Sequence, residues 1–323
     1  MLFKNNSDMY IMLYKILYGT EDVNIDVTQI ALEKMVKDNI IFIPEGDERR
    51  GHYFTDPLYK TLKSVYVEDT FSNINYKYDH TKNIYIDIVL NKIYVNDVPD
   101  YIKNIWFSNE LALAEIHKHL KIDFGSLEHE FPEQLMAVKY LTGDEKVLEI
   151  GGNIGRNSLV ISYIMNKKNN NQLVSLECDE NIFAQLKHNK DINSLDFFIE
   201  NSALSKRKLI QKGWDTICSE VLLEGYKNVK TITLDELIKK YNIIFDTLIL
   251  DCEGAFYYIL MDMPEILNNI QLIIMENDYW DITHKNYIDN VLKANDFYVE
   301  YTEPGGWGPC YHNFFEVWKK IKV

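Results

Sequence analysis

Acidic and small residues follow an apolar run in VLEIGGNIGRNS, residues 147–158, in a pattern that fits a ligand-binding turn. The run contains Glu149 and ends in a turn that holds Gly151, Gly152 and Gly155 before a helical segment begins. Glycines at such a turn let the backbone approach a ligand closely, although the same turn also occurs where no ligand binds. The glycine spacing is G-G-x-x-G, so the segment predicts a ligand-binding turn that lacks the G-x-G-x-x-G dinucleotide fingerprint.

A second acid, Glu177, closes the next apolar run in LVSLECDE and lies 22 residues after Gly155. An acid about 20 residues beyond a glycine turn is placed to accept hydrogen bonds from ribose hydroxyl groups. Asp179 and Glu180 follow closely, so the alternative is a solvated acidic loop. The turn and the acid, in this order, indicate a nucleoside site.

Carboxylates also end two later apolar runs. LILDCEG places Asp251 and Glu253 after one run, and LIIMEND places Glu276 and Asp278 after another. If the two runs are neighbouring parallel strands, these side chains meet at the edge where open α/β sheets bind ligands. Such a ring can hold a divalent cation, take a proton from a hydroxyl group or bind sugar hydroxyls. We predict catalytic roles for Asp251 and Glu253. The candidate metal ligands are Asp251, Glu276 and Asp278, unless the last two only cap the following loop.

Alternating strand-like and helical segments must position these residues. Apolar patterns predict strands at 147–150, 173–176, 196–199, 243–250 and 271–275, and helices at 157–165, 183–188, 259–267 and 287–294. Two final strands, at 297–301 and 314–318, have no helix between them. This order predicts an α/β, Rossmann-like, doubly wound and mostly parallel sheet that ends in an antiparallel C-terminal hairpin.

A smaller α+β domain is expected before this region. We predict a β-rich N-terminal accessory domain at residues 1–100, a helical connector at 101–130 and the catalytic domain at 131–323. Segment 43–54, IPEGDERRGHYF, is either a polar site or an ordinary charged loop. The accessory domain would bind a glycan acceptor, form an oligomer or only support the catalytic domain.

Composition limits the function classes. The chain has 323 residues, of which 46% are hydrophobic, so it can bury a substantial core. Its net charge is −15, with 34 basic against 49 acidic residues, which disfavours nucleic acid as a partner. No apolar run reaches the ~18–20 residues of a membrane span, and we expect no signal peptide and no membrane partner. The four cysteines show no metal-binding spacing, which favours a reducing, cytoplasmic location.

The region from about residue 131 to 318 resembles the FkbM family of class I S-adenosylmethionine (AdoMet) methyltransferases. The matching stretches are LEIGGNIG, LECDE, ENSALS, TITLDELI, LDCEG and IIMEN. The resemblance implies AdoMet as the methyl donor and a hydroxyl oxygen of a sugar, glycan or similar small molecule as the acceptor. It implies a methionine site at Glu149, Gly151 and Asn153, in the turn that also holds Gly152 and Gly155, a ribose site at Glu177, and an adenine site at Asn201, Ser202 and Ala203.

Two positions depart from the family pattern. Ile249 stands where a basic residue is frequent, and Phe256 stands where an acid is frequent. These changes put the acceptor and the catalytic detail in doubt. The alternative function is therefore a catalytically impaired methyltransferase-fold protein that binds glycans or acts as a scaffold. A nicotinamide-dependent oxidoreductase conflicts with the glycine spacing.

Two loops are predicted to cover the acceptor, which would be a small molecule, a nucleotide sugar or a glycan. Segment 205–227 carries four Lys or Arg residues before Trp214, and it either contacts an anionic or glycosidic substrate or is a solvated connector. Segment 303–315 carries His312, which is either a catalytic general base or an ordinary surface histidine, with His284 as the weaker candidate. Trp307 would stack on a sugar ring or only hold the hairpin. We favour deprotonation of the acceptor by a carboxylate, and a divalent metal is the open alternative.

Overall fold

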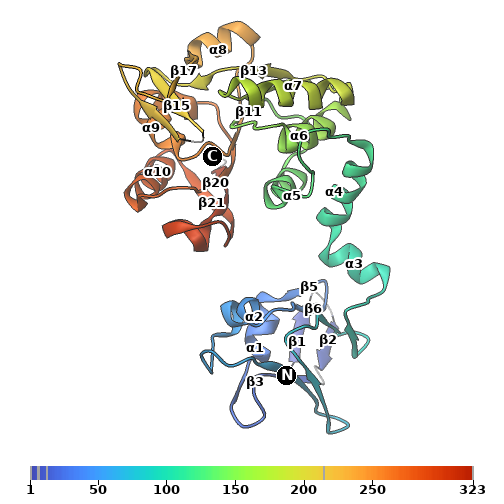
Figure 1. The fold of residues 1–323 in the computed structure, drawn as a ribbon. Coiled ribbons are helices and arrows are strands. Elements are labelled where there is room, and N and C mark those ends of the chain that lie inside the picture. Colours follow the sequence, from blue (N-terminus) through green and yellow to red (C-terminus); the bar gives the residue numbers. More distant parts are fainter. Residues whose placement is uncertain (1, 6–7, 12–13, 214, 322–323) are drawn as a thin grey trace. The chain divides into compact units, whose positions relative to one another are not determined.

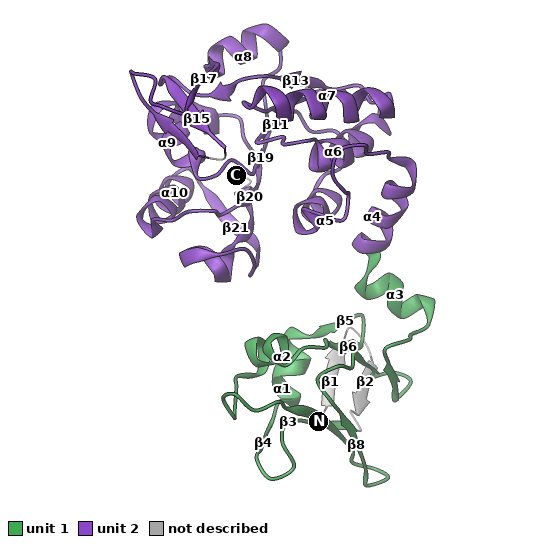
Figure 2. Ribbon diagram, viewed as in Figure 1, with its two compact units in different colours: residues 1–108 green, residues 109–323 purple. Residues whose placement is uncertain are grey.

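The computed structural model describes residues 2–5, 8–11, 14–213 and 215–321 (Figure 1). The chain divides into two compact units, residues 1–108 and residues 109–323 (Figure 2). Each unit has buried apolar clusters of its own, so each is described by itself. Across the described residues, none of the helices has the length and apolar character needed to cross a membrane.

Unit 1 is built on antiparallel strands. Two four-stranded sheets, in the orders β4-β3-β7-β8 and β10-β9-β6-β5, enclose an apolar core together with α1. The elements are β1 (Leu2–Asn5), β2 (Asp8–Ile11), β3 (Tyr14–Gly19), β4 (Asn24–Asp26), α1 (Thr28–Lys34), β5 (Val36–Lys37), β6 (Ile40–Ile43), α2 (Asp47–Phe54), β7 (Ser64–Asp69), β8 (Ile74–Tyr78), β9 (Ile84–Asp87), β10 (Lys92–Val95) and α3 (Asp100–Trp106).

The charged segment 43–54 is not an ordinary charged loop, because most of it forms α2. Arg50 on this helix is fully buried, and it donates hydrogen bonds to the backbone carbonyls of Pro44, Asp79 and Lys82. A buried guanidinium group is tolerated when its donors are satisfied in this way. The role of Arg50 is therefore to hold α2 to the segment at Pro44 and to the turn at 79–82.

Unit 2 contains a seven-stranded sheet in the order β13-β12-β11-β19-β20-β22-β21. The first five strands are parallel, and β22 runs antiparallel between β20 and β21. The predicted α/β fold with a mostly parallel sheet is confirmed. The elements are α4 (Ser108–His119), α5 (Phe131–Tyr140), β11 (Val147–Ile150), α6 (Arg156–Asn166), β12 (Leu173–Leu176), α7 (Glu180–Asn193), β13 (Phe198–Glu200), α8 (Leu234–Tyr241), β19 (Thr247–Leu250), α9 (Ala255–Asp262), η1 (Pro264–Leu267), β20 (Leu272–Glu276), α10 (Ile282–Ala294), β21 (Phe297–Glu303), η2 (Gly308–Asn313) and β22 (Phe315–Lys320).

Two apolar layers cover the faces of this sheet. Alternate strand residues such as Leu148 and Leu248 pack with α8, α9 and α10, whereas Val147 and Ile249 pack on the opposite face with α4 to α7. This division follows from the two-residue period of a strand. The side of the sheet on which a strand-end residue emerges can thus be read from the strand that precedes it.

Helix α9 differs from the predicted helix at 259–267. It begins at Ala255 and ends at Asp262, and the rest of the predicted segment is the 3₁₀ helix η1. Pro264 explains the break, because proline has no N–H to continue an α-helix.

The insertion after β13 folds into two small sheets. One pairs β14 with β18 and the other has the order β16-β15-β17. Their strands are β14 (Ala203–Leu204), β15 (Leu209–Lys212), β16 (Asp215–Cys218), β17 (Lys227–Val229) and β18 (Thr231–Ile232). Segment 205–227 is therefore a structured β-rich insertion.

Candidate functional site

A cavity of about 440 Å³ lies at the carboxyl ends of β11, β12 and β19. Its volume is within the range of about 300–1,000 Å³ that small-molecule sites occupy. The glycine turn and Glu177 line one part, the residues after β19 and helix α9 line another, and β15 and β16 of the insertion complete it. The carboxyl edge of a parallel sheet is where α/β folds bind ligands.

Close packing explains the glycines of the turn. Gly151 has φ +92°, and a Cβ atom there would lie 1.5 Å from the backbone oxygen of Asp251. A Cβ on Gly152 would lie 2.1 Å from the Ser175 hydroxyl oxygen. Of the predicted turn residues, Gly151 and Asn153 line the cavity, while Gly152 and Gly155 do not. The turn is thus held against both neighbouring strands, and only part of it can touch a ligand.

Glu177 is a buried acid that lines the cavity, and its side chain is 7% exposed. One carboxylate oxygen accepts a hydrogen bond from the Asn153 backbone N–H at 3.0 Å, and the other accepts from that of Asp179 at 2.7 Å. Burial raises the pKa of this carboxyl group. Each oxygen retains a lone pair, so the group can still accept hydrogen bonds from two hydroxyls of a ligand.

Residues 202–205 form the wall next to Glu177. Ser202 lines the cavity, but its hydroxyl oxygen is buried and interacts with the Glu200 carboxylate. Ala203 also lines the cavity, but Asn201 does not, because its amide donates to the backbone carbonyl of Glu177 at 2.9 Å. Ser202 and Ala203 therefore form a wall of small residues, and Asn201 positions the Glu177 backbone.

The insertion supplies cavity residues that sequence reasoning did not identify, among them Gln211 and Ile217. Three of the four predicted cations of this segment are paired with acids. Arg207 forms two hydrogen bonds with Asp262 at 2.5 and 2.8 Å, and Lys206 and Lys208 form ion pairs with other acids. The expectation that they contact an anionic substrate is therefore not supported by this geometry. Trp214 lies outside the described residues.

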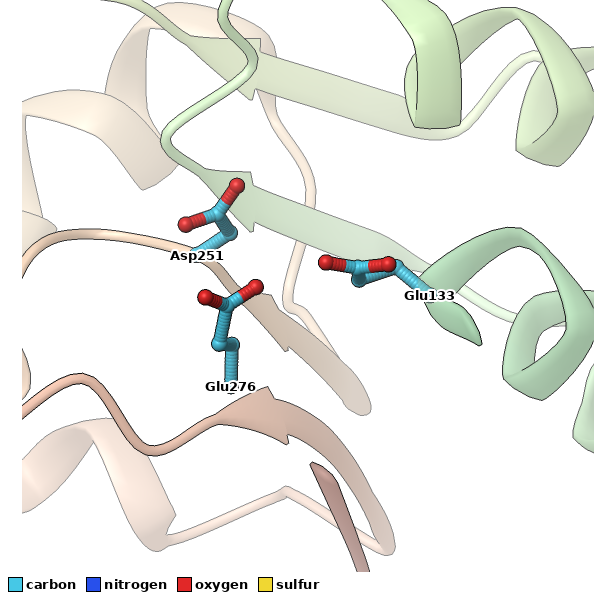
Figure 3. A group of neighbouring side chains, drawn as sticks. All are labelled: Glu133, Asp251 and Glu276. Atoms are coloured by element: carbon cyan, nitrogen blue, oxygen red, sulfur yellow. The ribbon is translucent and has the colours of Figure 1, made fainter. Parts of the chain in front are cut away.

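Three carboxylates gather at the sheet edge (Figure 3). Glu133 comes from the first turn of α5, Asp251 follows β19, and Glu276 is the last residue of β20. One oxygen of each lies within 4.8 Å of the others. Asp251 and Glu276 continue the alternation of Ile249 and Ile274, whose side chains face the layer that contains α5. Sequence reasoning missed Glu133, because no local pattern connects α5 with these strand ends.

Asp278 is not part of this cluster, although it was predicted as a metal ligand. One of its oxygens accepts a hydrogen bond from the Gly254 backbone N–H at 2.9 Å, and the other is buried without a partner. Burial and the charge of Glu253 raise the pKa of Asp278 to about 7. Glu253 itself is exposed and lines the cavity. Asp278 therefore stabilises the turn after β19.

The sheet edge carries surplus negative charge. Burial and the neighbouring charges of Glu130 and Glu133 raise the pKa of Asp251 well above its usual range. Burial and a hydrogen bond with Glu133 raise the pKa of Glu276. Arg156 pairs with Glu130 and so neutralises a different acid. The carboxylates of this edge must therefore hold protons or attract a cation.

Glu149 lies behind this edge and does not line the main cavity. Its side chain is 2% exposed, it accepts a hydrogen bond from the Ser158 hydroxyl, and burial raises its pKa to about 7. It lines a separate cavity of about 10 Å³, shared with Glu133, Gly151 and Asp251. A cavity of this size holds about one water molecule. The predicted contact of Glu149 with the methionine part of AdoMet would therefore have to run through water or through other residues.

The candidate histidines do not line the cavity. His312 is exposed in η2, and His284 stacks on Tyr257 with ring centroids 3.8 Å apart. The rings of Trp307 and Trp280 are tilted against each other with centroids 4.1 Å apart, and Trp280 is 84% exposed. The geometry therefore offers carboxylates rather than an imidazole as the proton acceptor at the cavity.

No family model matches this sequence. No curated protein matches it either. Solved structures similar to the chain include a putative O-methyltransferase from Klebsiella pneumoniae, with 12% identity, a TM-score of 0.40 and coverage of 66% of this chain and 90% of that one. An O-methyltransferase from Bacillus cereus in complex with SAH has 15% identity, a TM-score of 0.37 and coverage of 68% and 96%. Methyltransferase FkbM from Methylobacillus flagellatus KT has 11% identity, a TM-score of 0.38 and coverage of 66% and 59%.

Proposed function

We propose that the chain is an AdoMet-dependent O-methyltransferase of the FkbM type, acting on a hydroxyl group of a sugar, a glycan or a similar small molecule. One observation carries the proposal: a cavity at the carboxyl edge of the sheet joins the buried Glu177, beside a glycine turn, to an acidic edge at Asp251. A nucleoside with a positively charged end matches this arrangement.

The two ends of the cavity support a nucleoside donor. Glu177 can accept hydrogen bonds from ribose hydroxyls, and Leu204 and Met263 offer apolar surface for a base. At the other end, the acidic edge favours the sulfonium and ammonium groups of AdoMet. A dinucleotide would instead bring a pyrophosphate towards acids, and Arg207 is already paired with Asp262. These contacts favour AdoMet over a nicotinamide dinucleotide.

Methyl transfer to a hydroxyl group needs alignment and removal of a proton. Asp251 and Glu253 line the cavity, and we assign the proton acceptor to this pair. Burial raises the pKa of Asp251, so its carboxylate, once ionised, takes a proton from a hydroxyl group more readily than an exposed carboxylate does. The exposed Trp280, which follows β20 and lies against the half-buried Trp307, offers an aromatic surface for a sugar ring.

The alternative of an impaired enzyme rests on the apolar residues at two family positions. Ile249 is 3% exposed within one core layer, and Phe256 is fully buried in the other. Charged side chains at these positions would need buried partners, so the apolar residues are explained by packing. This observation weakens the alternative, and the assay for methyl transfer distinguishes the two functions.

Calorimetry with AdoMet and S-adenosylhomocysteine tests the donor site on the full chain. We expect binding by the wild type and an affinity about 10- to 100-fold weaker in Glu177→Gln, because a charge-assisted hydrogen bond contributes about 1.5–3 kcal/mol. Glu180→Gln is the matched control, since Glu180 is exposed and does not line the cavity. Absence of binding by the folded wild type, or equal affinity in Glu177→Gln, would contradict the proposal.

Radiolabelled AdoMet and a panel of nucleotide sugars and glycans test the reaction. We expect transfer of the labelled methyl group to at least one acceptor, and mass spectrometry then locates the methylated oxygen. AdoMet binding without transfer to any acceptor would support the glycan-binding or scaffold alternative instead.

A further inference from the structure

The carboxylates of Glu133, Asp251 and Glu276 come from three elements that the sheet register brings together. Leu250 of β19 lies opposite Met275 of β20, so the next residues, Asp251 and Glu276, emerge side by side. Helix α5 covers the face on which both emerge, and it presents Glu133 from its first turn (Figure 3). Their oxygens approach within 4.8 Å of one another, which is close enough for one ion to contact all three.

Glu133 provides a second observation that points to a ligand. Its side chain is only 7% exposed, and its Oε2 atom is buried without a donor from the described residues, because the neighbouring Glu276 carboxyl group can pair with Glu133 only through a shared proton. Figure 3 shows this carboxylate directed towards Asp251 and Glu276. A buried acceptor left without a partner is unfavourable, and more so when it is charged. A bound cation would remove this cost and would also relieve the repulsion among the three acids.

The surroundings fit a hard cation. The three side chains offer only carboxylate oxygens, which Mg²⁺ and Mn²⁺ prefer as ligands. The cavity of about 10 Å³ that Glu133 and Asp251 line leaves room for about one water molecule. The guanidinium group of Arg156 is paired with Glu130, so it does not neutralise the three acids in place of a metal ion.

We propose that Glu133, Asp251 and Glu276 form a binding site for one divalent cation of the Mg²⁺ or Mn²⁺ class. Asp251 also lines the main cavity, so the ion lies beside the expected methyl donor. Its remaining coordination positions are open to water and to the acceptor hydroxyl, whose acidity the ion increases. This role at the acceptor rests on the proposed methyl transfer, whereas the ion site itself does not.

Equilibrium dialysis of the full chain against Mn²⁺, followed by metal analysis, tests the site. We expect one Mn²⁺ per chain, and an affinity at least about tenfold weaker in Glu133→Gln, since loss of an outer partner alone costs about 10- to 100-fold. Glu276→Gln is the second variant and should weaken binding similarly. Glu128→Gln is the control, because Glu128 is an exposed acid just before α5 that is not part of the cluster.

Thermal unfolding with and without Mn²⁺ gives an independent readout. The melting temperature of the wild type should rise with Mn²⁺, and that of Glu133→Gln should rise little. Without metal, Glu133→Gln should be more stable than the wild type, because one repelling charge is gone. Absence of Mn²⁺ binding by the wild type, or equal binding in Glu133→Gln, would show that the three acids share protons instead. Calorimetry with AdoMet in metal-free buffer separates this result from the proposed function, because the donor site does not require the ion.

Discussion

Replacement of Glu149 by glutamine should change how the stability of the protein depends on pH. The carboxyl group is buried beneath the sheet edge, where the hydroxyl groups of Ser158 and Ser175 are its hydrogen-bond donors. Burial is the largest cause that raises its pKa, from 4.5 to about 7. A glutamine side chain has a similar shape and stays neutral at every pH.

The sign and size of the effect follow from the two pKa values. Below pH 4.5 Glu149 is neutral in both the folded and the unfolded chain, and its full contribution to stability is present. Between pH 4.5 and about 7 the unfolded chain loses this proton while the folded chain keeps it, so stability falls as the pH rises. At about 1.4 kcal/mol for each pH unit, the loss is about 3 kcal/mol. Glu149→Gln should not show this loss.

Urea unfolding at several pH values between about 5 and 8 measures the effect, with tryptophan fluorescence as the signal. Trp318 is fully buried in β22 and reports on unit 2. We expect the stability of Glu149→Gln minus that of the wild type to grow by most of the ~3 kcal/mol over this range. The exposed Glu180→Gln is the control and should follow the wild type. A constant difference between Glu149→Gln and the wild type would refute the conclusion that Glu149 is neutral in the fold below pH 7.

Other substitutions test the site and its support. Gly151→Ala should abolish AdoMet binding or folding, because its Cβ would lie 1.5 Å from a backbone oxygen. Gly213→Ala, with nothing within 4 Å, should cost only about 1 kcal/mol of strain, and calorimetry and circular dichroism compare the two. Lys285→Met should lower the unfolding free energy by about 3–5 kcal/mol, because the buried Glu316 loses its 3.0 Å ion pair, and an unchanged urea midpoint would contradict this. Trp280→Ala should raise KM for a sugar acceptor several-fold with little change in kcat or AdoMet affinity, and an unchanged KM would remove this residue from the acceptor site.

Much of the sheet could be predicted because strands and helices leave local patterns. The apolar runs at β11, β12 and β20 were located within about a residue, since each run ends in a polar residue or a glycine at the point where the chain leaves the core. The same patterns identified Glu177 and Asp251 as strand-end acids. The insertion was less predictable, because its short strands have mostly exposed residues and no clear period.

The sequence by itself determined which acids stand at the ends of buried strands, because the two-residue period of a strand decides which side chains are buried and where the run stops. Only the tertiary structure decided which of them meet. Glu133 joins Asp251 and Glu276 through the packing of α5 on the sheet, while Asp278 turns away to the Gly254 backbone. The tertiary structure also leaves His312 exposed in η2. Contacts between residues far apart in the chain depend on strand order and helix packing, which no short stretch of sequence specifies.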